Sequence, residues 1–327
     1  MRQPYVWLLF IAVLLMSCKK DQEPKATSAQ AQAYLDEVIG IMQIYSVNRK
    51  TIDWDLFKNK VYTKAQGAQT IADTHPSIQL ALTLLGDNHS FYTAATGGIQ
   101  LFPTTSVHCT DAAPTSVLHP PTIGYIQVPP SGGYDAKGVK YGLFGQEYAQ
   151  ALQDSIKAQD SDQIQAWIID LRALSLDMFS GLVGIGPILG EGIAGYFMDP
   201  DGNYYPWSYE KGAAKSGQSI ISSVPNPYVL RNPNPKVAVL TNRLTSSSGE
   251  ALAIAFIGRP NTRSFGFPTC GLSTANAPMM LSDGARLALT VGVMADRNKK
   301  AYGNAVQPDE LLPAVTSVQK AIEWLSK

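Results

Sequence analysis

The order of apolar and polar positions divides the chain into a helical first part and an α/β second part. Between residues 31 and 45 apolar side chains recur at helical spacing, which predicts an amphipathic helix. Asp53 can cap a second helix, and Pro76 can open a third that ends at Leu85. Gly86 and the turn-forming residues after it stop that helix. We therefore predict a small helical bundle at the start of the folded chain.

The rest of the chain alternates between strand and helix patterns. Ile123–Val128 and Ala166–Leu171 predict strands, with an amphipathic helix carrying Tyr148 and Leu152 between them. This order predicts a right-handed parallel crossover. The later predicted elements are hairpins turning at 199–202 and 283–284, a buried strand at 237–240, a helix opening at 245–250, a strand at 263–267 and a last helix with Val318, Ile322 and Leu325 on one face.

The first residues carry the pattern of an export signal. Arg2 is followed by the apolar run 5–16, too short for a good transmembrane span, and then by Ser17-Cys18. The residues around the cysteine resemble a bacterial lipobox, in which Cys18 is lipid-modified. An ordinary cleaved signal with an incidental cysteine is the alternative. We expect an exported lipoprotein of the cell envelope, held at the outer membrane through a signal peptide at 1–17, Cys18 and a flexible tether at 18–30.

Composition narrows the possible partners. Lys+Arg and Asp+Glu number 26 each, so the chain has no net positive charge that would attract a polyanion. We therefore expect no nucleic-acid partner. An oxidising compartment would permit Cys109 and Cys270 to pair, but the sequence leaves this open, and two buried apolar cysteines are the simpler interpretation. No cofactor and no metal site is expected.

Two residues are candidates for nucleophilic chemistry. Ser247 lies where a predicted buried strand gives way to a helix, so free backbone N–H groups and the positive helix end would surround its hydroxyl. The same run, ending at Glu250, is also a capping box, and that structural role is the interpretation this motif favours alone. His89 follows a predicted helix end beside groups that could fix its tautomer. Each signal is weak by itself.

Several short runs of residues occur along the chain in the order that is typical of a known protein family. They are Leu85-Gly86-Asp87-Asn88-His89-Ser90, Gly124-Tyr125-Ile126, Ile168-Ile169-Asp170-Leu171-Arg172, Val239-Leu240-Thr241 through Ser247-Ser248-Gly249-Glu250, Gly266-Phe267-Pro268-Thr269 and Gln307-Pro308-Asp309. In this register the chain resembles the tail-specific (C-terminal processing) serine peptidase family. The resemblance implies an α/β fold with a crotonase-like (ClpP/crotonase) core of stacked βαβ units, preceded by the small N-terminal helical bundle.

The resemblance also implies domains and chemistry. It divides the folded chain into a helical domain at 31–92 and a catalytic domain at 93–327, with no room for a PDZ domain. It places the nucleophile at Ser247 and, in the family's tricorn-like version, the general base at His89. The family's serine–lysine version is excluded in this register, because Leu272 stands at the lysine position.

Other positions depart from the family pattern. Tyr302 stands where a glutamate would orient the histidine, so the orienting candidates are Ser90, Asp87 and Asp296. The resemblance places the oxyanion hole at Ser248 together with Ser175 or Leu176, in a loop that lacks the family's glycines. Two hypotheses follow. The protein is a serine endopeptidase acting on envelope peptides or unfolded proteins, or it is a catalytically impaired member that binds peptides without turnover.

Overall fold

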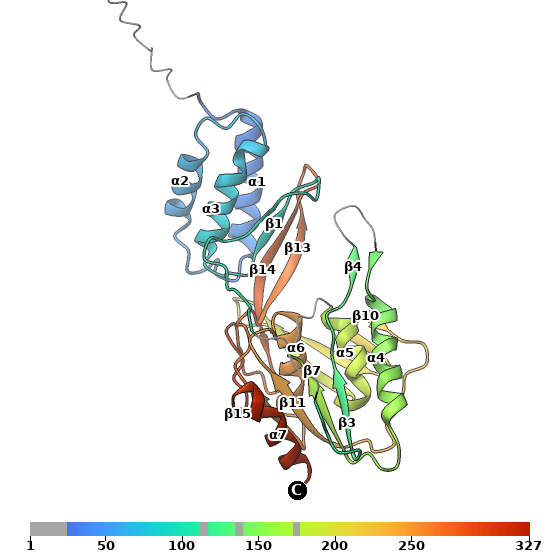
Figure 1. Cartoon of the computed structure of the whole chain (residues 1–327). Coiled ribbons are helices and arrows are strands. Elements are labelled where there is room, and N and C mark those ends of the chain that lie inside the picture. Colours follow the sequence, from blue (N-terminus) through green and yellow to red (C-terminus); the bar gives the residue numbers. More distant parts are fainter. Residues whose placement is uncertain (1–24, 112–116, 135–139, 173–176) are drawn as a thin grey trace, which may run out of the picture.

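The computed structural model describes residues 25–111, 117–134, 140–172 and 177–327. A helical unit stands above a larger α/β core, and a long β-ribbon runs between them (Figure 1). The signal peptide, the tether up to residue 24 and Cys18 lie outside the described residues. Within the described residues, none of the helices is long and apolar enough to span a bilayer.

Each helix of the helical unit has a cap, and the caps predicted at Asp53 and Gly86 are present. Ser28 caps the first helix, Asp53 caps the second by accepting from the Leu56 N–H at 3.0 Å, and Gly86 ends the third in the left-handed conformation. The first helix begins at Ala29, slightly before the predicted domain boundary at residue 31. The elements are α1 (Ala29–Tyr45), α2 (Trp54–Lys64), a 3₁₀ turn (Ala72–Thr74) and α3 (His75–Leu85).

The α/β core is built on a five-stranded sheet in which every pairing is parallel, in the order β15-β12-β11-β6-β3. The predicted crossover from β3 through α4 to β6 is present. The elements of this layer are β3 (Ile123–Gln127), α4 (Gly145–Gln159), β6 (Ala166–Asp170), α5 (Met178–Leu189), β11 (Lys236–Thr241), α6 (Ser248–Phe256), β12 (Thr262–Gly266), β15 (Glu310–Leu311) and α7 (Ala314–Leu325).

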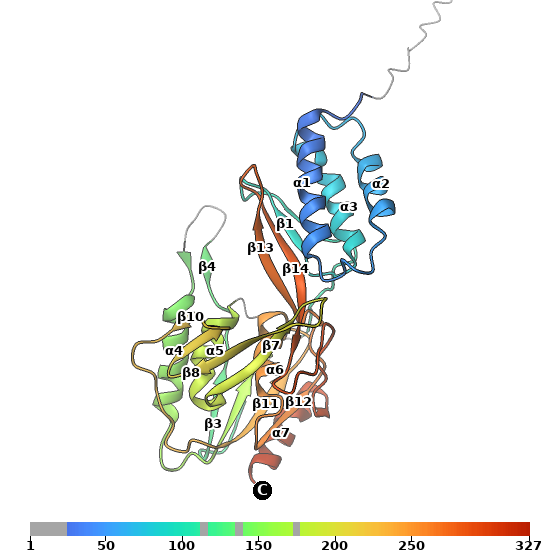
Figure 2. The ribbon, with the colours of Figure 1, turned by 180° about the vertical axis from the view of Figure 1, so that it is seen from behind.

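Alternate residues of the parallel strands serve two hydrophobic layers. Trp167 and Ile169 of β6 pack in the cluster that includes α4, α5 and α6, whereas Ile168 packs on the other face with Leu325 of α7. Figure 2 shows these helices on opposite sides of the sheet. Because both faces are covered, β6 is buried throughout, as its uninterrupted apolar sequence predicts.

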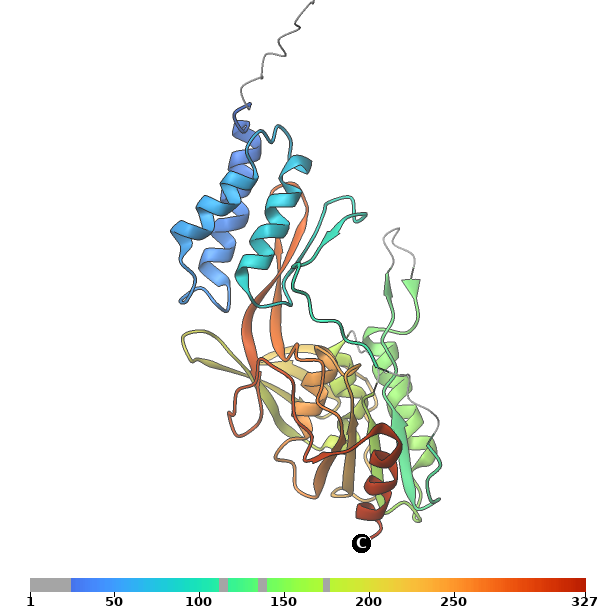
Figure 3. The same ribbon diagram turned by 60° about the vertical axis from the view of Figure 1, so that its left-hand side comes forward.

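An antiparallel sheet connects the core to the helical unit, in the order β10-β9-β8-β7-β14-β1-β2, with β13 also paired to β14. Strand β14 joins the two parts: Arg286–Ala288 pair with β1, and Val293–Ala295 pair with β7 of the core. Figure 3 shows the β13–β14 ribbon rising from the core to the helices. The strands are β1 (Phe91–Thr93), β2 (Gln100–Leu101), β7 (Gly192–Met198), β8 (Tyr204–Glu210), β9 (Ala213–Ser216), β10 (Ser219–Ser223), β13 (Thr274–Met280) and β14 (Arg286–Ala295); a separate two-stranded hairpin comprises β4 (Gly133–Tyr134) and β5 (Lys140–Tyr141).

The ribbon and the β7–β8 hairpin both contact the helical unit through polar side chains. At the ribbon tip, the Ser282 N–H donates to Glu37 at 2.8 Å, and Tyr34 donates to Asp283 at 2.9 Å. At the hairpin turn, Asp201 forms ion pairs with Arg49 and Lys50, which follow α1. The helical unit is therefore fastened to the rest of the chain at two separate places.

Candidate active site

Ser247 occupies the junction between β11 and α6 in an uncommon backbone conformation. It is the N-cap of α6, half-buried, with φ of +48°. A positive φ is costly for a residue other than glycine and is found where the surrounding structure enforces it. The Ser247 N–H donates to Glu250 at 2.9 Å, which is half of the predicted capping box. This junction brings the helix N-terminus and its free N–H groups next to the serine hydroxyl.

Glu250 holds this junction against a neighbouring segment. Its fully buried carboxylate accepts from the Gly271 N–H at 2.9 Å, from the Leu272 N–H at 2.7 Å and from the Thr269 hydroxyl, in addition to Ser247. Burial raises the pKa of Glu250, and these donors oppose the rise. Leu272 stands where the serine–lysine version has its lysine. It contributes a backbone N–H to Glu250, and its side chain cannot accept a proton.

His89 lies in the loop between α3 and β1, and its backbone is fixed on both sides. Its N–H donates to Asp87 at 2.9 Å, and its carbonyl accepts from the side chain of Asn276 on β13 at 3.0 Å. The ring nitrogen Nδ1 lies 2.6 Å from the hydroxyl of Thr274, also on β13. Burial lowers the pKa of His89, and the nearby Asp87 opposes this in part. A neutral imidazole, able to accept a proton, therefore prevails near neutral pH.

A cavity of about 560 Å³ opens beside Ser247, and His89 itself is not among the residues that line it. Ser247 and Ser248 line it together with Thr274, the residue that contacts the His89 ring. The predicted nucleophile and the hydroxyl that contacts the predicted base thus line one cavity, and both belong to the α/β second part of the chain. The remaining wall is mainly apolar and comprises Met178, Phe179, Phe197, Met198, Asp199, Tyr205, Ser216, Ala275, Asn276, Ala277, Val291, Gly292 and Met294.

Asp199 brings a carboxylate to this wall at the end of β7. The side chain of Asn203 donates to it at 2.9 Å and the Tyr205 hydroxyl at 3.0 Å. These bonds, with that of Asn203 the strongest influence, lower the pKa of Asp199 to about 2. In the described parts of the chain, no cluster of three or more His, Cys, Asp or Glu side chains could hold a metal ion.

The predicted orienting groups have other partners. The Ser90 hydroxyl donates to Asp87 at 2.7 Å, and Asp87 also accepts from the backbone of the same loop. Asp296 accepts from the hydroxyl of Tyr302 at 3.0 Å and from backbone N–H groups of its own turn. The contact of Thr274 with the His89 ring could not be predicted, because nothing in the local sequence of Thr274 relates it to a histidine 185 positions away.

The oxyanion-hole residues are described in part. Ser248 is the first residue of α6, so its N–H is one of those that an α-helix leaves without an intrahelical partner. It also lines the cavity beside Ser247. Ser175 and Leu176 lie outside the described residues.

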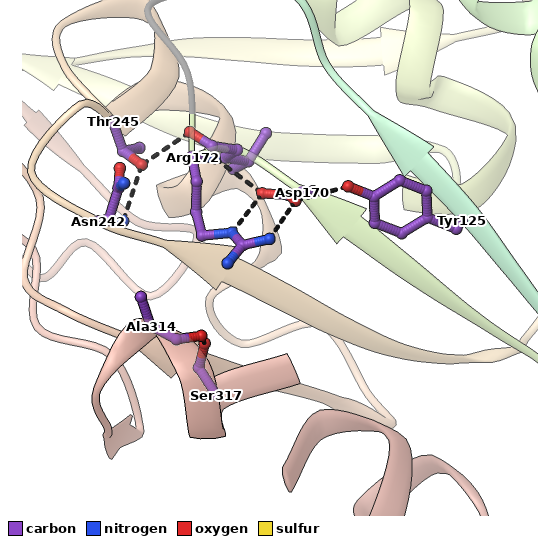
Figure 4. Close-up of polar contacts among 8 residues, drawn as sticks. Tyr125, Asp170, Arg172, Asn242, Thr245, Ala314 and Ser317 are labelled. Atoms are coloured by element: carbon purple, nitrogen blue, oxygen red, sulfur yellow. Dashed lines mark hydrogen bonds and ion pairs between the residues drawn. The ribbon is translucent and has the colours of Figure 1, made fainter. Parts of the chain in front are cut away.

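A buried polar network lies beside the site, at the ends of β6 and β11 (Figure 4). The Arg172 guanidinium donates to both oxygens of Asp170, at 2.9 and 2.7 Å, and the Tyr125 hydroxyl donates to the same carboxylate at 2.7 Å. Thr245 donates to the carbonyl of Leu171 at 2.7 Å. This network joins the end of β6 to the loop that leads into Ser247.

Cys109 and Cys270 form a disulfide, so the simpler interpretation of two unpaired buried cysteines was wrong. Their partnership could not be inferred, because the loop with Cys109 is brought to Cys270 by tertiary packing across a separation of 161 residues. The Cys270 N–H donates to the Thr245 carbonyl at 2.9 Å. Cys270 directly precedes Gly271 and Leu272, whose N–H groups bind Glu250. The cross-link therefore adjoins the segment that supports the Ser247 junction.

Removing this cross-link is expected to lower stability. The Cys109→Ser/Cys270→Ser variant should lose about 2–4 kcal/mol of unfolding free energy, because a long loop is no longer closed in the unfolded chain. Urea unfolding of the variant and of the oxidised and reduced wild type measures this. The reduced wild type should match the variant. A variant as stable as the oxidised wild type would contradict a stabilising role for the disulfide.

Comparisons with known proteins agree with this architecture. The model of peptidase family S41 matches residues 122–312. The nisin-resistance protein of Lactococcus lactis subsp. lactis is 26% identical over 275 residues, which cover 84% of this chain and 80% of that protein.

Solved structures share the fold over nearly the whole chain. A lipoprotein from Streptococcus agalactiae has a TM-score of 0.68 at 21% identity, covering 92% of this chain and 98% of that one. The photosystem II D1 C-terminal processing protease has a TM-score of 0.57 at 16% identity, covering 91% and 100%. At these identities the likeness concerns the fold. The family model, however, spans more than half of the chain and confirms the resemblance read from the motifs: this chain belongs to peptidase family S41.

Proposed function

We propose that the protein is a serine endopeptidase in which Ser247 forms the acyl-enzyme and His89 is the general base. One observation supports this above all: Ser247 lines the same cavity as Thr274, whose hydroxyl lies 2.6 Å from Nδ1 of His89. With Nδ1 held on that side, the other ring nitrogen, Nε2, is available to a second partner. Membership in a peptidase family supports the same chemistry.

The proposed reaction follows from these positions. His89 Nε2 takes the hydroxyl proton as Ser247 Oγ bonds to the carbonyl carbon of the substrate, and the imidazolium returns that proton to the leaving amine as the C–N bond breaks. Water then attacks the acyl-enzyme with the same base and releases the acid. The N–H of Ser248 stabilises the oxyanion at the start of α6. The second donor is proposed to come from Ser175 or Leu176.

We also infer that the parallel sheet with its covering helices is the crotonase-like core expected of this family. The observation in favour is the β3-α4-β6 crossover, followed by further parallel strands with helices between them. In such an arrangement the nucleophile stands at the carboxyl end of a strand, where loops are free to form a site. Ser247 follows β11 at that edge.

The proposed substrates are peptides or unfolded proteins of the cell envelope, reached from a lipid anchor at Cys18 in the outer membrane. Membership in a peptidase family favours a peptide or protein substrate, and the largely apolar cavity favours one that buries apolar side chains. The Cys109–Cys270 disulfide favours an exported protein, because such bonds persist in oxidising compartments.

A second candidate function is peptide binding without turnover. Leu272 stands in place of the lysine of the serine–lysine version, and Tyr302 stands in place of the glutamate expected in the tricorn-like version. The loop after Arg172 also lacks the family's glycines. In this case the cavity would bind a peptide saturably, and no product would form at any pH.

A fluorophosphonate probe distinguishes the two functions, because it reacts with a serine that an adjacent base activates. The wild type should be labelled and Ser247→Ala should not. Ser246→Ala is the matched control, since it removes a buried neighbouring hydroxyl and should keep the label. Labelling of Ser247→Ala as strong as that of the wild type would overturn the assignment of the nucleophile. No labelling of any of the three proteins, with saturable peptide binding, would favour the second function.

A further inference from the structure

The His89 ring is held by a hydroxyl that comes from a distant strand. Thr274 opens β13, and its Oγ1 lies 2.6 Å from His89 Nδ1. Thr274 is 7% exposed, and it lines the cavity beside Ser247. The neighbouring carboxylate of Asp87 is occupied by the backbone N–H groups of His89 and Ser90 and by the Ser90 hydroxyl. The contact to the ring is thus a neutral one.

We propose that Thr274 is the positioning residue of the catalytic base: its hydroxyl oxygen accepts a hydrogen bond from Nδ1–H of His89, which leaves Nε2 unprotonated toward Ser247. This inference rests on the proposed function. A histidine used as a base must carry its single proton on the nitrogen away from the nucleophile, and an acceptor on that nitrogen selects this tautomer. Thr274 gives up no proton in the cycle, and its own hydroxyl hydrogen can point into the cavity that it lines.

The backbone around His89 is held by the same strand that carries Thr274. Asn276, two residues after Thr274 on the same strand, donates to the His89 carbonyl at 3.0 Å and accepts from the Thr290 hydroxyl at 2.8 Å. The Thr290 N–H donates to the Ser90 hydroxyl at 2.9 Å. Strands β13 and β14 therefore fix the loop, and Thr274 fixes the ring within it.

A neutral acceptor has a consequence for pH dependence. A hydroxyl stabilises an imidazolium less than a carboxylate does, so the base should stay neutral, and active, below the ordinary histidine range. Burial acts in the same direction, since it lowers the pKa of His89. Asp87 is the charged group that raises the pKa of His89 and so opposes both effects. The side chains that β13 and β14 place around this loop (Thr274, Asn276 and Thr290) are uncharged, and Glu250 of α6 is bound by its own donors.

Thr274→Val tests the proposal, because it keeps the shape of the side chain and removes the hydroxyl. We expect kcat for hydrolysis of a quenched-peptide library to fall about 10- to 100-fold, the loss seen when an outer-shell partner that orients a metal-bound histidine is removed, with KM little changed. Thr274→Ser should restore most of kcat. Thr262→Val removes a hydroxyl bonded to Arg259, remote from the site, and should leave kcat unchanged. The acid limb of kcat/KM should move to lower pH in Thr274→Val, since the imidazolium loses its acceptor.

Nitrogen NMR of histidine-labelled protein provides a readout that is independent of turnover. In the wild type the His89 proton should reside on Nδ1, with the signal assigned by its loss in His89→Gln, and in Thr274→Val it should be shared between both nitrogens. A wild-type proton on Nε2, or an undiminished kcat in Thr274→Val, would overturn the proposal. An inactive wild type with its proton on Nδ1 would overturn the peptidase function while supporting the placement of the ring by Thr274.

Discussion

Replacing His89 by alanine is expected to lower kcat for peptide hydrolysis by about 10⁴- to 10⁶-fold, the range seen when one member of a serine–base pair is removed. Without the imidazole, the Ser247 hydroxyl has no acceptor for its proton during attack, and the leaving amine has no donor. KM should change little, because the ring contributes to the transition state more than to substrate binding. Initial rates with the quenched-peptide library measure both constants.

A second histidine provides the control for this variant. His108 is exposed in the loop before Cys109, and His108→Ala should retain wild-type kcat. Circular dichroism and the urea midpoint should show that His89→Ala remains folded. If folded His89→Ala keeps more than about one-tenth of the wild-type kcat, His89 is not the base, since general-base catalysis alone contributes about 10²–10⁴-fold.

Removing one partner of the buried ion pair should produce the largest loss of stability. Asp170→Ala leaves the Arg172 guanidinium, with a side chain only 4% exposed, without its counter-charge and without both of its carboxylate bonds. Breaking such a pair costs about 3–5 kcal/mol, because an uncompensated charge stays buried. Tyr125 also loses its acceptor. The free energy of unfolding in urea is the quantity to compare with that of the wild type.

Two further variants separate the charge from the loss of packing. Asp170→Ala/Arg172→Met removes both charges and should be clearly more stable than Asp170→Ala. The exposed pair between Arg231 and Asp162 is the matched control, and Asp162→Ala should cost less than about 1 kcal/mol. Equal losses in Asp170→Ala and Asp162→Ala would show that burial does not set the energy of the pair.

Most of the α/β core could be predicted from local pattern, and one helix shows where pattern fails. The apolar run of β6 and the caps of α2 and α3 were sufficient to predict those elements. Helix α5 was not predicted, because its glycines and Pro187 disfavour helices. The structure explains the glycines: a Cβ at Gly184 would lie 2.5 Å from the Leu152 side chain, and one at Gly186 would lie 2.2 Å from the Tyr209 ring. Close packing thus overrides local propensity.

Some residues of the candidate site could likewise be predicted from the sequence, and others could not. Ser247 and His89 could be proposed from sequence because the short runs that contain them stand in the order of a known family, although each run is a weak signal alone. Thr274 and the partnership of Cys109 with Cys270 could not, since both depend on contacts between segments more than 150 residues apart. Local sequence contains no trace of such contacts, because they form only when segments distant in the chain pack together.

The cross-link beside the Ser247 junction also matters for how the protein is prepared. Chain synthesised in the cytosol of a bacterial expression host meets glutathione and thioredoxin, which keep its thiols reduced. Such material would lack the Cys109–Cys270 bond next to the segment that binds Glu250. Secretion into a periplasm, or oxidative refolding followed by a thiol count, yields the form whose activity bears on the natural enzyme.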